Sequence, residues 1–376
     1  MDALRFADRL CCLDEMNAHF RRIYELSRTV DDPINLVVGQ PDFEVPRSLR
    51  DAACAAIQAG RNSYAPTQGL VPLREQIHAA VSQRYPQATG RDVLLTGGTM
   101  AALNLALLAT LNPGDEVILF DPAFMAYEPM VRLFGGVPVW VDTYPDFQID
   151  PERVAAALSP RTKVILFCSP GNPTGVIQHP ERVQAVAELA RQRAILLVSD
   201  EIYGEFVYDA PCVSPLAFNP ETLVVGSWGK THAITGWRIG YAHGTKRLIE
   251  AMTRVQMVTF VAGPSFAQHA LLDAGPIDLS EPLRAYQRKR DWLLAELTAD
   301  YPGPKPGGAF YLFLPTPWGT ATEFVNEAVR HKLMILPGCV FGRRDTHFRL
   351  SYAVSDTMLE RGLAVLRRLA SGPNRF

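Results

Sequence analysis

Lysine is scarce in this chain, since only six of its 37 basic residues are lysines, at positions 163, 230, 246, 289, 305 and 332. The 39 acidic residues leave a formal net charge of −2, so there is no excess of positive charge to bind nucleic acid. The longest strongly apolar run, residues 101–111, is far shorter than the roughly 20 residues that span a bilayer. We therefore expect neither a nucleic-acid partner nor a membrane partner.

Signals of secretion and of metal binding are also missing. The first ten residues include Asp2, Arg5, Asp8 and Arg9, unlike the apolar stretch of a signal peptide, and this favours a cytoplasmic location. The six cysteines are scattered and form no CxxC motif, so we expect reduced and mostly buried thiols. The eight histidines form neither an HxH nor an HxxxH motif, and we expect no metal site.

Two nucleotide-binding motifs are absent as well. Gly229-Lys230-Thr231 resembles the end of a phosphate-binding P-loop, but Val224 stands where that motif needs a glycine. No GxGxxG motif follows a predicted strand, so a dinucleotide-binding fold has no support.

Apolar β-branched runs alternate with helical patterns, which predicts an α/β fold with a mostly parallel sheet. The predicted strands are residues 92–96, 116–120, 137–141, 163–168, 194–199 and 223–227. Residues 180–193 begin with a proline and place Val183, Val186, Ala187 and Ala190 on one face, as expected of a crossover helix.

The pattern changes after Gly275-Pro276. A charged amphipathic stretch at 281–297 leads to predicted strands at 309–314, 334–336 and 348–353 and predicted helices at 320–331 and 357–369. We predict a large domain over residues 45–275 and a smaller α+β domain over residues 276–376, which the N-terminal segment, residues 1–44, joins. In that segment, residues 13–27 have a helical pattern and residues 34–38 are expected to be extended.

Open parallel sheets bind ligands beyond the carboxyl ends of their strands, so the residues there are candidates for chemistry. Gly97-Gly98-Thr99-Met100 opens a helix, which suits an anion such as phosphate, although such a turn is also common without a ligand. Other strand ends supply Phe124, Asn172, Asp200, Tyr203 and Lys230. Pyridoxal 5′-phosphate requires this set, because a lysine forms its Schiff base and a carboxylate keeps its pyridine nitrogen protonated. Burial would lower the pKa of the lysine, which could then act as a general base.

The sequence resembles the class I aminotransferases of fold type I, which use pyridoxal 5′-phosphate. The resemblance runs from Val38-Gly39-Gln40-Pro41-Asp42-Phe43 to Phe348-Arg349-Leu350-Ser351-Tyr352-Ala353. Its most specific segment is residues 227–241, preceded in order by Asn172-Pro173-Thr174-Gly175 and Asp200-Glu201-Ile202-Tyr203. It implies a large domain with a mostly parallel seven-stranded sheet covered by helices, and a homodimer with shared active sites.

The resemblance also implies a role for each matching residue. Lys230 would form the Schiff base and move a proton between the substrate Cα and the cofactor C4′. Asp200 would pair with the pyridine nitrogen, and Asn172 and Tyr203 would hydrogen-bond the ring 3-oxygen. Gly98, Thr99, Met100, Ser227 and Arg238 would bind the phosphate, Phe124 would stack on the ring, and Tyr64 would reach the phosphate of the neighbouring subunit. Gly39, Asn172 and Arg349 would hold the substrate α-carboxylate, Arg349 in a two-pronged way. Taken singly, Asp200 also suits a helix cap, Asn172 a turn and Phe124 the core.

Reversible transamination between an L-amino acid and a 2-oxo acid is the leading hypothesis. A lyase or cyclase of the same fold is an alternative, and a non-catalytic effector-binding domain is disfavoured because no basic DNA-binding arm precedes the fold. Some aspartate-type relatives carry a lysine in place of Met100, and residues 255–268 contain no charge. We therefore expect neutral or aromatic amino acids to be better donors than aspartate. Arg343 and Arg344 could reach an acidic side chain, but we expect them to be exposed to solvent.

Overall fold

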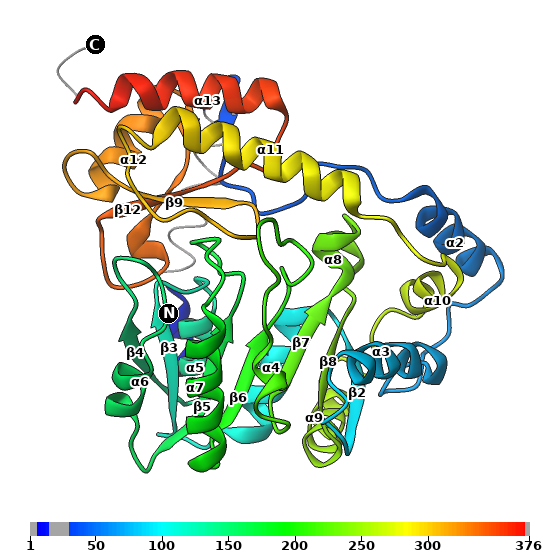
Figure 1. The fold of residues 1–376 in the computed structure, drawn as a ribbon. Coiled ribbons are helices and arrows are strands. Elements are labelled where there is room, and N and C mark those ends of the chain that lie inside the picture. The colour runs from blue at the N-terminus through cyan, green and yellow to red at the C-terminus, as the bar shows by residue number, and fades with distance from the viewer. Residues whose placement is uncertain (1–5, 15–29, 373–376) are drawn as a thin grey trace, which may run out of the picture.

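A seven-stranded sheet organises the structure, a computed structural model that describes residues 6–14 and 30–372 (Figure 1). Its strands are β2 (Arg91–Thr96), β3 (Glu116–Asp121), β4 (Val137–Asp142), β5 (Thr162–Cys168), β6 (Leu196–Asp200), β7 (Leu223–Ser227) and β8 (Gly240–Thr245). In the order β2-β8-β7-β6-β5-β3-β4, every pair is parallel except the two that β8 forms. The six predicted strands and the mostly parallel sheet are confirmed, with small shifts at the strand ends.

Strand β8 was not located from the sequence, because its two glycines weaken the strand pattern. Gly240 is needed for close packing, since a Cβ there would lie 2.8 Å from both the Gly98 Cα and the Gly226 carbonyl oxygen. The antiparallel strand therefore brings its backbone directly against the glycine turn that follows β2.

Helices cover both faces of the sheet. One face packs on α4 (Thr99–Thr110), α5 (Tyr127–Leu133) and α9 (Lys246–Thr259), and the other on α3 (Val71–Arg84), α6 (Pro151–Ala157) and α7 (Pro180–Gln192). Helix α7 is the predicted crossover helix, and its buried side chains are the four apolar ones named from the sequence. Smaller elements are η1 (Asp8–Leu13), α2 (Arg47–Gln58), η2 (Pro215–Ala217), α8 (Trp228–Thr231), η3 (Thr235–Trp237) and α10 (Ser265–Asp273).

A second group of elements lies beyond the carboxyl edge of the sheet, at the top of Figure 1. It contains α11 (Ser280–Leu297), β9 (Tyr311–Pro315), α12 (Ala321–Arg330), β11 (Leu336–Pro337), η4 (Gly338–Val340), β12 (His347–Ser351) and α13 (Asp356–Leu369). Its antiparallel sheet has the order β11-β12-β9, and β1 (Ile34–Asn35) pairs in parallel with β10 (Leu333–Met334). These contacts support the predicted domain division, which stays a prediction. The predicted helix at 13–27 falls almost entirely outside the described residues.

The prediction of mostly buried thiols is wrong. All six cysteines are free, but Cys11 and Cys54 are exposed and the other four are partly exposed. Helix α2 shows the reason for Cys54, because Leu49, Ala53 and Ala56 form its buried face and leave the neighbouring position outside. Among the described residues, no helix is long and apolar enough to cross a membrane.

Arg290 joins α11 to two loops near the sheet. The side chain is fully buried, and its guanidinium donates to the two Asp209 carboxylate oxygens at 2.7 and 3.0 Å and to the Pro306 carbonyl at 2.9 Å. A two-pronged contact of this kind is among the stronger polar interactions in proteins.

We expect Arg290→Ala to lower the free energy of unfolding by on the order of 3 kcal/mol, because it removes a buried side chain and leaves Asp209 without this partner. Urea unfolding followed by circular dichroism measures the loss. Arg288→Ala on the same helix is the matched control, since the Arg288–Glu281 pair is exposed and such pairs contribute about 1 kcal/mol or less. An equal loss of unfolding free energy in the two variants would contradict a stabilising role for the buried Arg290.

Candidate active site

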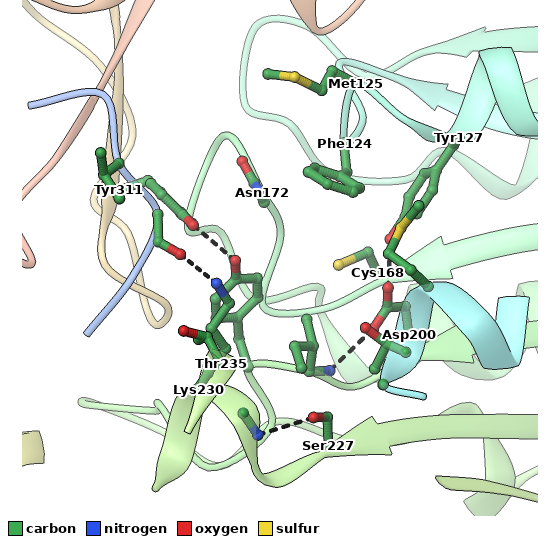
Figure 2. A pocket seen from close by; sticks show the side chains of 18 of the residues that line it. Phe124, Met125, Tyr127, Cys168, Asn172, Asp200, Ser227, Lys230, Thr235 and Tyr311 are labelled. Atoms are coloured by element: carbon green, nitrogen blue, oxygen red, sulfur yellow. Dashed lines mark hydrogen bonds between the residues drawn. The ribbon is translucent and has the colours of Figure 1, made fainter. Parts of the chain in front are cut away.

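A cavity of about 550 Å³ lies where the carboxyl edge of the large sheet meets the antiparallel sheet. Every residue predicted for the site lines it except Tyr64, which is 88% exposed. Those residues are Gly39, Gly98, Thr99, Met100, Phe124, Asn172, Asp200, Tyr203, Ser227, Lys230, Arg238 and Arg349. Figure 2 shows Lys230 and Tyr311 at one side of the cavity and Asp200 with Tyr127 at the other.

The glycine turn before α4 forms an anion-binding corner. Gly98 has a φ of 90°, a left-handed conformation that favours glycine, and a Cβ there would lie 3.0 Å from Arg238 Nη2. Arg238 Nη1 donates to the Thr235 carbonyl at 2.8 Å, which holds the guanidinium near the first turn of α4. Ser227 Oγ accepts from the Gly229 N–H at 2.9 Å and donates to the Ile239 carbonyl at 2.6 Å. Free N–H groups of a first helical turn and a guanidinium together suit a phosphate.

Lys230 lies on α8, directly after β7, and its Nζ donates to the Gly39 carbonyl. Burial and, to a smaller extent, the nearby positive charges of Arg349 and Arg238 together lower the pKa of this amine to about 8. A substantial fraction of the amine is therefore neutral near physiological pH, as a nucleophile or a general base requires.

Asp200 ends β6 and is 4% exposed. Its carboxylate accepts from the Tyr127 hydroxyl at 2.8 Å and from the Ile202 N–H at 3.1 Å. Burial raises the pKa of this carboxyl to about 6, while the Tyr127 hydrogen bond opposes that rise. Asp200 thus remains mostly ionised at neutral pH and can pair with a cationic group in the cavity.

Arg349 is buried on β12 between two aromatic rings, with its guanidinium carbon 4.6 Å from the Tyr311 centroid and 4.8 Å from the Phe341 centroid. Its Nη1 donates to Asn172 Oδ1 at 2.9 Å and its Nη2 to the Val37 carbonyl at 2.6 Å. The Nε has no hydrogen-bond partner among the described residues. A buried cation with an unused donor is prepared for an anionic ligand.

Several cavity residues were not identified from the sequence. The main ones are Tyr127, which contacts Asp200, and Tyr311, whose hydroxyl lies 2.7 Å from that of Tyr203. The others are Asn35, Val37, Val38, Met125, Cys168, Ile202, Gly229, Thr235 and Leu336. Tyr127 is the first residue of α5, three positions after Phe124, which it contacts edge-to-face at 5.5 Å, so a search limited to the strand ends misses it.

Arg343 and Arg344 do not line the cavity. Arg344 Nη2 lies 2.7 Å from Asp142 Oδ2, and its guanidinium stacks on Tyr144 at 4.4 Å. The Arg343 guanidinium lies 6.0 Å from the centre of the Trp140 ring. In addition, the described residues contain no group of three or more His, Cys, Asp or Glu side chains placed to hold a metal ion.

The sequence and the fold of the chain are similar to those of known aminotransferases. Residues 31–366 match the family model of class I and II aminotransferases. The chain is 39% identical over 366 residues to an aspartate/prephenate aminotransferase of Thermus thermophilus, covering 92% of this chain and 93% of that protein. It is 29% identical over 368 residues to aromatic-amino-acid aminotransferase 2 of Thermococcus litoralis, covering 92% and 94%. A solved structure of aspartate aminotransferase from Thermotoga maritima matches with a TM-score of 0.89 at 30% identity, covering 97% of this chain and 100% of that chain.

The chain belongs to the class I and II aminotransferases. It is an α/β enzyme of fold type I that catalyses transamination, and the lyase or cyclase alternative gains no support from these relatives.

The low pKa of Lys230 leads to a test on the ligand-free protein. The rate at which an acylating reagent modifies Lys230 should rise with pH and reach half its maximum near pH 8, because only the neutral amine reacts. Arg349→Met should move that midpoint upward, since it removes a neighbouring positive charge. Mass spectrometry measures the modification, and exposed Lys163 in the same digest controls for the reagent. A midpoint at the ordinary lysine value, about 10.4, would contradict the expectation.

Proposed function

We propose that the chain holds pyridoxal 5′-phosphate as a Schiff base on Lys230 and exchanges an amino group between an L-amino acid with an uncharged side chain and a 2-oxo acid. The observation that carries this proposal is the charge pattern of the cavity. Lys230, Arg238 and Arg349 line it together, and Asp200 is the only carboxylate among the described lining residues. Such a site suits a ligand pair with one phosphate, one carboxylate and one cationic ring nitrogen.

The residues present fit the cofactor. The anion-binding corner at Gly98 would take the phosphate, because a Cβ at this position would fill the space beside Arg238. Asp200 would hold the protonated ring nitrogen, and the hydrogen bond from Tyr127 keeps that carboxylate in place. Asn172 and Tyr203 would contact the ring 3-oxygen, and Phe124 would cover one face of the ring. When bound, the cofactor supplies an electron-withdrawing ring that weakens the bond between the substrate Cα and its hydrogen.

Two residues would handle the substrate itself. Arg349 would bind the α-carboxylate, with its guanidinium already oriented by Asn172 and by the rings of Tyr311 and Phe341. Once the substrate amino group has replaced it on the cofactor, Lys230 Nζ would take the proton from the substrate Cα and deliver it to the cofactor C4′. The lowered pKa of this amine suits both directions of that transfer at neutral pH.

The remainder of the cavity favours an uncharged donor side chain. Its lining includes Met100, Phe124, Met125, Ile202 and Leu336, all of which are apolar. The three lining cations have the roles given above, so a second substrate carboxylate would be buried without a dedicated partner, which is costly.

The donor preference can be measured with the holoenzyme. Phenylalanine or methionine should bleach the Schiff-base absorption, and a 2-oxo acid should restore it. We expect kcat/KM for phenylalanine to exceed that for aspartate by at least about tenfold, which corresponds to only about 1.4 kcal/mol. Met100→Lys should raise the relative use of aspartate, and Met100→Gln is the uncharged control. A preference for aspartate in the unchanged enzyme would contradict the proposed specificity, and release of ammonia without any need for a 2-oxo acid would contradict transamination.

We also propose that two copies share their active sites, with Tyr64 of each reaching the other cavity. Tyr64 is exposed and lies outside its own cavity, and the loop that carries it is tied to α9 by a hydrogen bond from Gln256 Nε2 to the Thr67 carbonyl at 2.6 Å. The residues after Gln256 include the exposed apolar side chains Met257, Val258, Phe260 and Val261. An exposed apolar patch beside an exposed tyrosine suits a self-complementary interface.

Subunit complementation tests this arrangement. Lys230→Ala and Tyr64→Ala should each have little activity alone, whereas unfolding and refolding them together should restore about a quarter of wild-type activity. That fraction is expected because half of the dimers are mixed and one of the two sites in each is intact. A mixture that stays as inactive as its parents, although it contains mixed dimers, would count against shared sites.

A further inference from the structure

Tyr311 contacts several predicted site residues at once. Its hydroxyl lies 2.7 Å from that of Tyr203, and the two rings meet edge-on at an interplanar angle of 87°. Its ring also lies against the Arg349 guanidinium. Figure 2 shows Tyr311 on the same side of the cavity as Lys230.

The position of Tyr311 is set from two sides. Arg349 stacks on its ring, and the backbone of Gly39 passes so close that any Cβ at position 39 would overlap the Tyr311 hydroxyl. Position 39 therefore accepts only glycine while Tyr311 keeps this place. Among the described residues, neither hydroxyl of the Tyr203–Tyr311 pair has a second hydrogen-bond partner.

One proton lies between the two hydroxyls, so the direction of this hydrogen bond decides what Tyr203 can offer to a ligand. If Tyr311 donates, the proton of Tyr203 is free to point into the cavity; if Tyr203 donates, it offers only a lone pair. Burial raises the pKa of both phenols, so both stay protonated at neutral pH. The positive charge of Arg349 opposes that rise for both phenols, but its guanidinium lies against the Tyr311 ring, 4.6 Å from the centroid, and this contact favours Tyr311 as the donor.

We propose that Tyr311 is a positioning residue that donates to Tyr203 and thereby directs the Tyr203 hydroxyl proton to the 3-oxygen of the cofactor. This inference rests on the proposed function, because it concerns the same cofactor. Donation from Tyr311 also polarises the Tyr203 hydroxyl and strengthens its own hydrogen bond.

The experiment is an absorbance titration of the Schiff base in purified holoenzyme. A weaker hydrogen bond to the 3-oxygen leaves more negative charge near the Schiff-base nitrogen, so this nitrogen retains its proton to higher pH. Tyr311→Phe, which retains the ring beside Arg349, should raise the Schiff-base pKa by roughly half a pH unit. Tyr203→Phe should raise it further. Gly39→Ala, which displaces the Tyr311 hydroxyl by overlap, should act in the same direction as Tyr311→Phe.

The double variant separates positioning from a general structural effect. In a Tyr203→Phe background, Tyr311→Phe should leave the titration unchanged, because the residue through which it acts is already gone. Tyr352→Phe is the matched control, since it removes another buried hydroxyl, which donates to the Ala309 carbonyl at 3.2 Å, outside the cavity. It should titrate like the wild type.

Two results would overturn the inference alone: a wild-type titration in Tyr311→Phe, or an equal shift whether or not Tyr203 is present. If the holoenzyme shows no absorption that depends on Lys230, the proposed function fails and this inference fails with it.

Discussion

An excess of positive charge dominates the cavity, and one of its three cations, Arg349, is buried. Lys230, Arg238 and Arg349 line it, while the nearby carboxylate of Asp200 is held by a phenol and a backbone N–H rather than by a cation. Like charges in a buried site cost free energy, and the structure limits that cost in two ways. Arg349 is solvated by an amide, a carbonyl and two aromatic rings, and Lys230 can lose its proton. The positive charge that remains without a partner attracts anions, so the cavity suits an anionic ligand.

The large sheet and the antiparallel sheet supply different residues of the cavity. The large sheet carries Asp200 at the end of β6 and Lys230 just after the adjacent parallel strand β7. The antiparallel sheet carries Arg349 and Tyr311, and Gly39 comes from the N-terminal segment that packs with it. The site is therefore complete only when these parts are packed together, a condition to which the buried Arg290 also contributes.

Much of the site could be predicted because reactive side chains follow the carboxyl ends of the strands and because the sequence motifs of the family occur in a specific order. Asp200 and Lys230 follow directly from that rule. Tyr311 could not be found in this way, because residues 309–314 form a continuous apolar run without the alternation that shows which side faces a cavity. The contact between Arg349 and Asn172 joins residues 177 positions apart, so it depends on packing that no local pattern contains. Similarly, β8 escaped prediction because its glycines serve close backbone contact rather than strand formation.

The pairing of β1 with β10 has a consequence for synthesis. Ile34 lies opposite Leu333, so the partner of the N-terminal strand is synthesised roughly 300 residues after it. At ~5–20 residues per second, this delay is about 15–60 s. During that time Ile34 and Leu36, both almost fully buried in the finished protein, have no strand to cover them. The lysine and the anion-binding corner belong to a sheet that is complete by Thr245 and can form on the nascent chain. Arg349, on β12, joins them only when synthesis is nearly finished, so the part of the cavity at the strand ends precedes the part that the antiparallel sheet supplies.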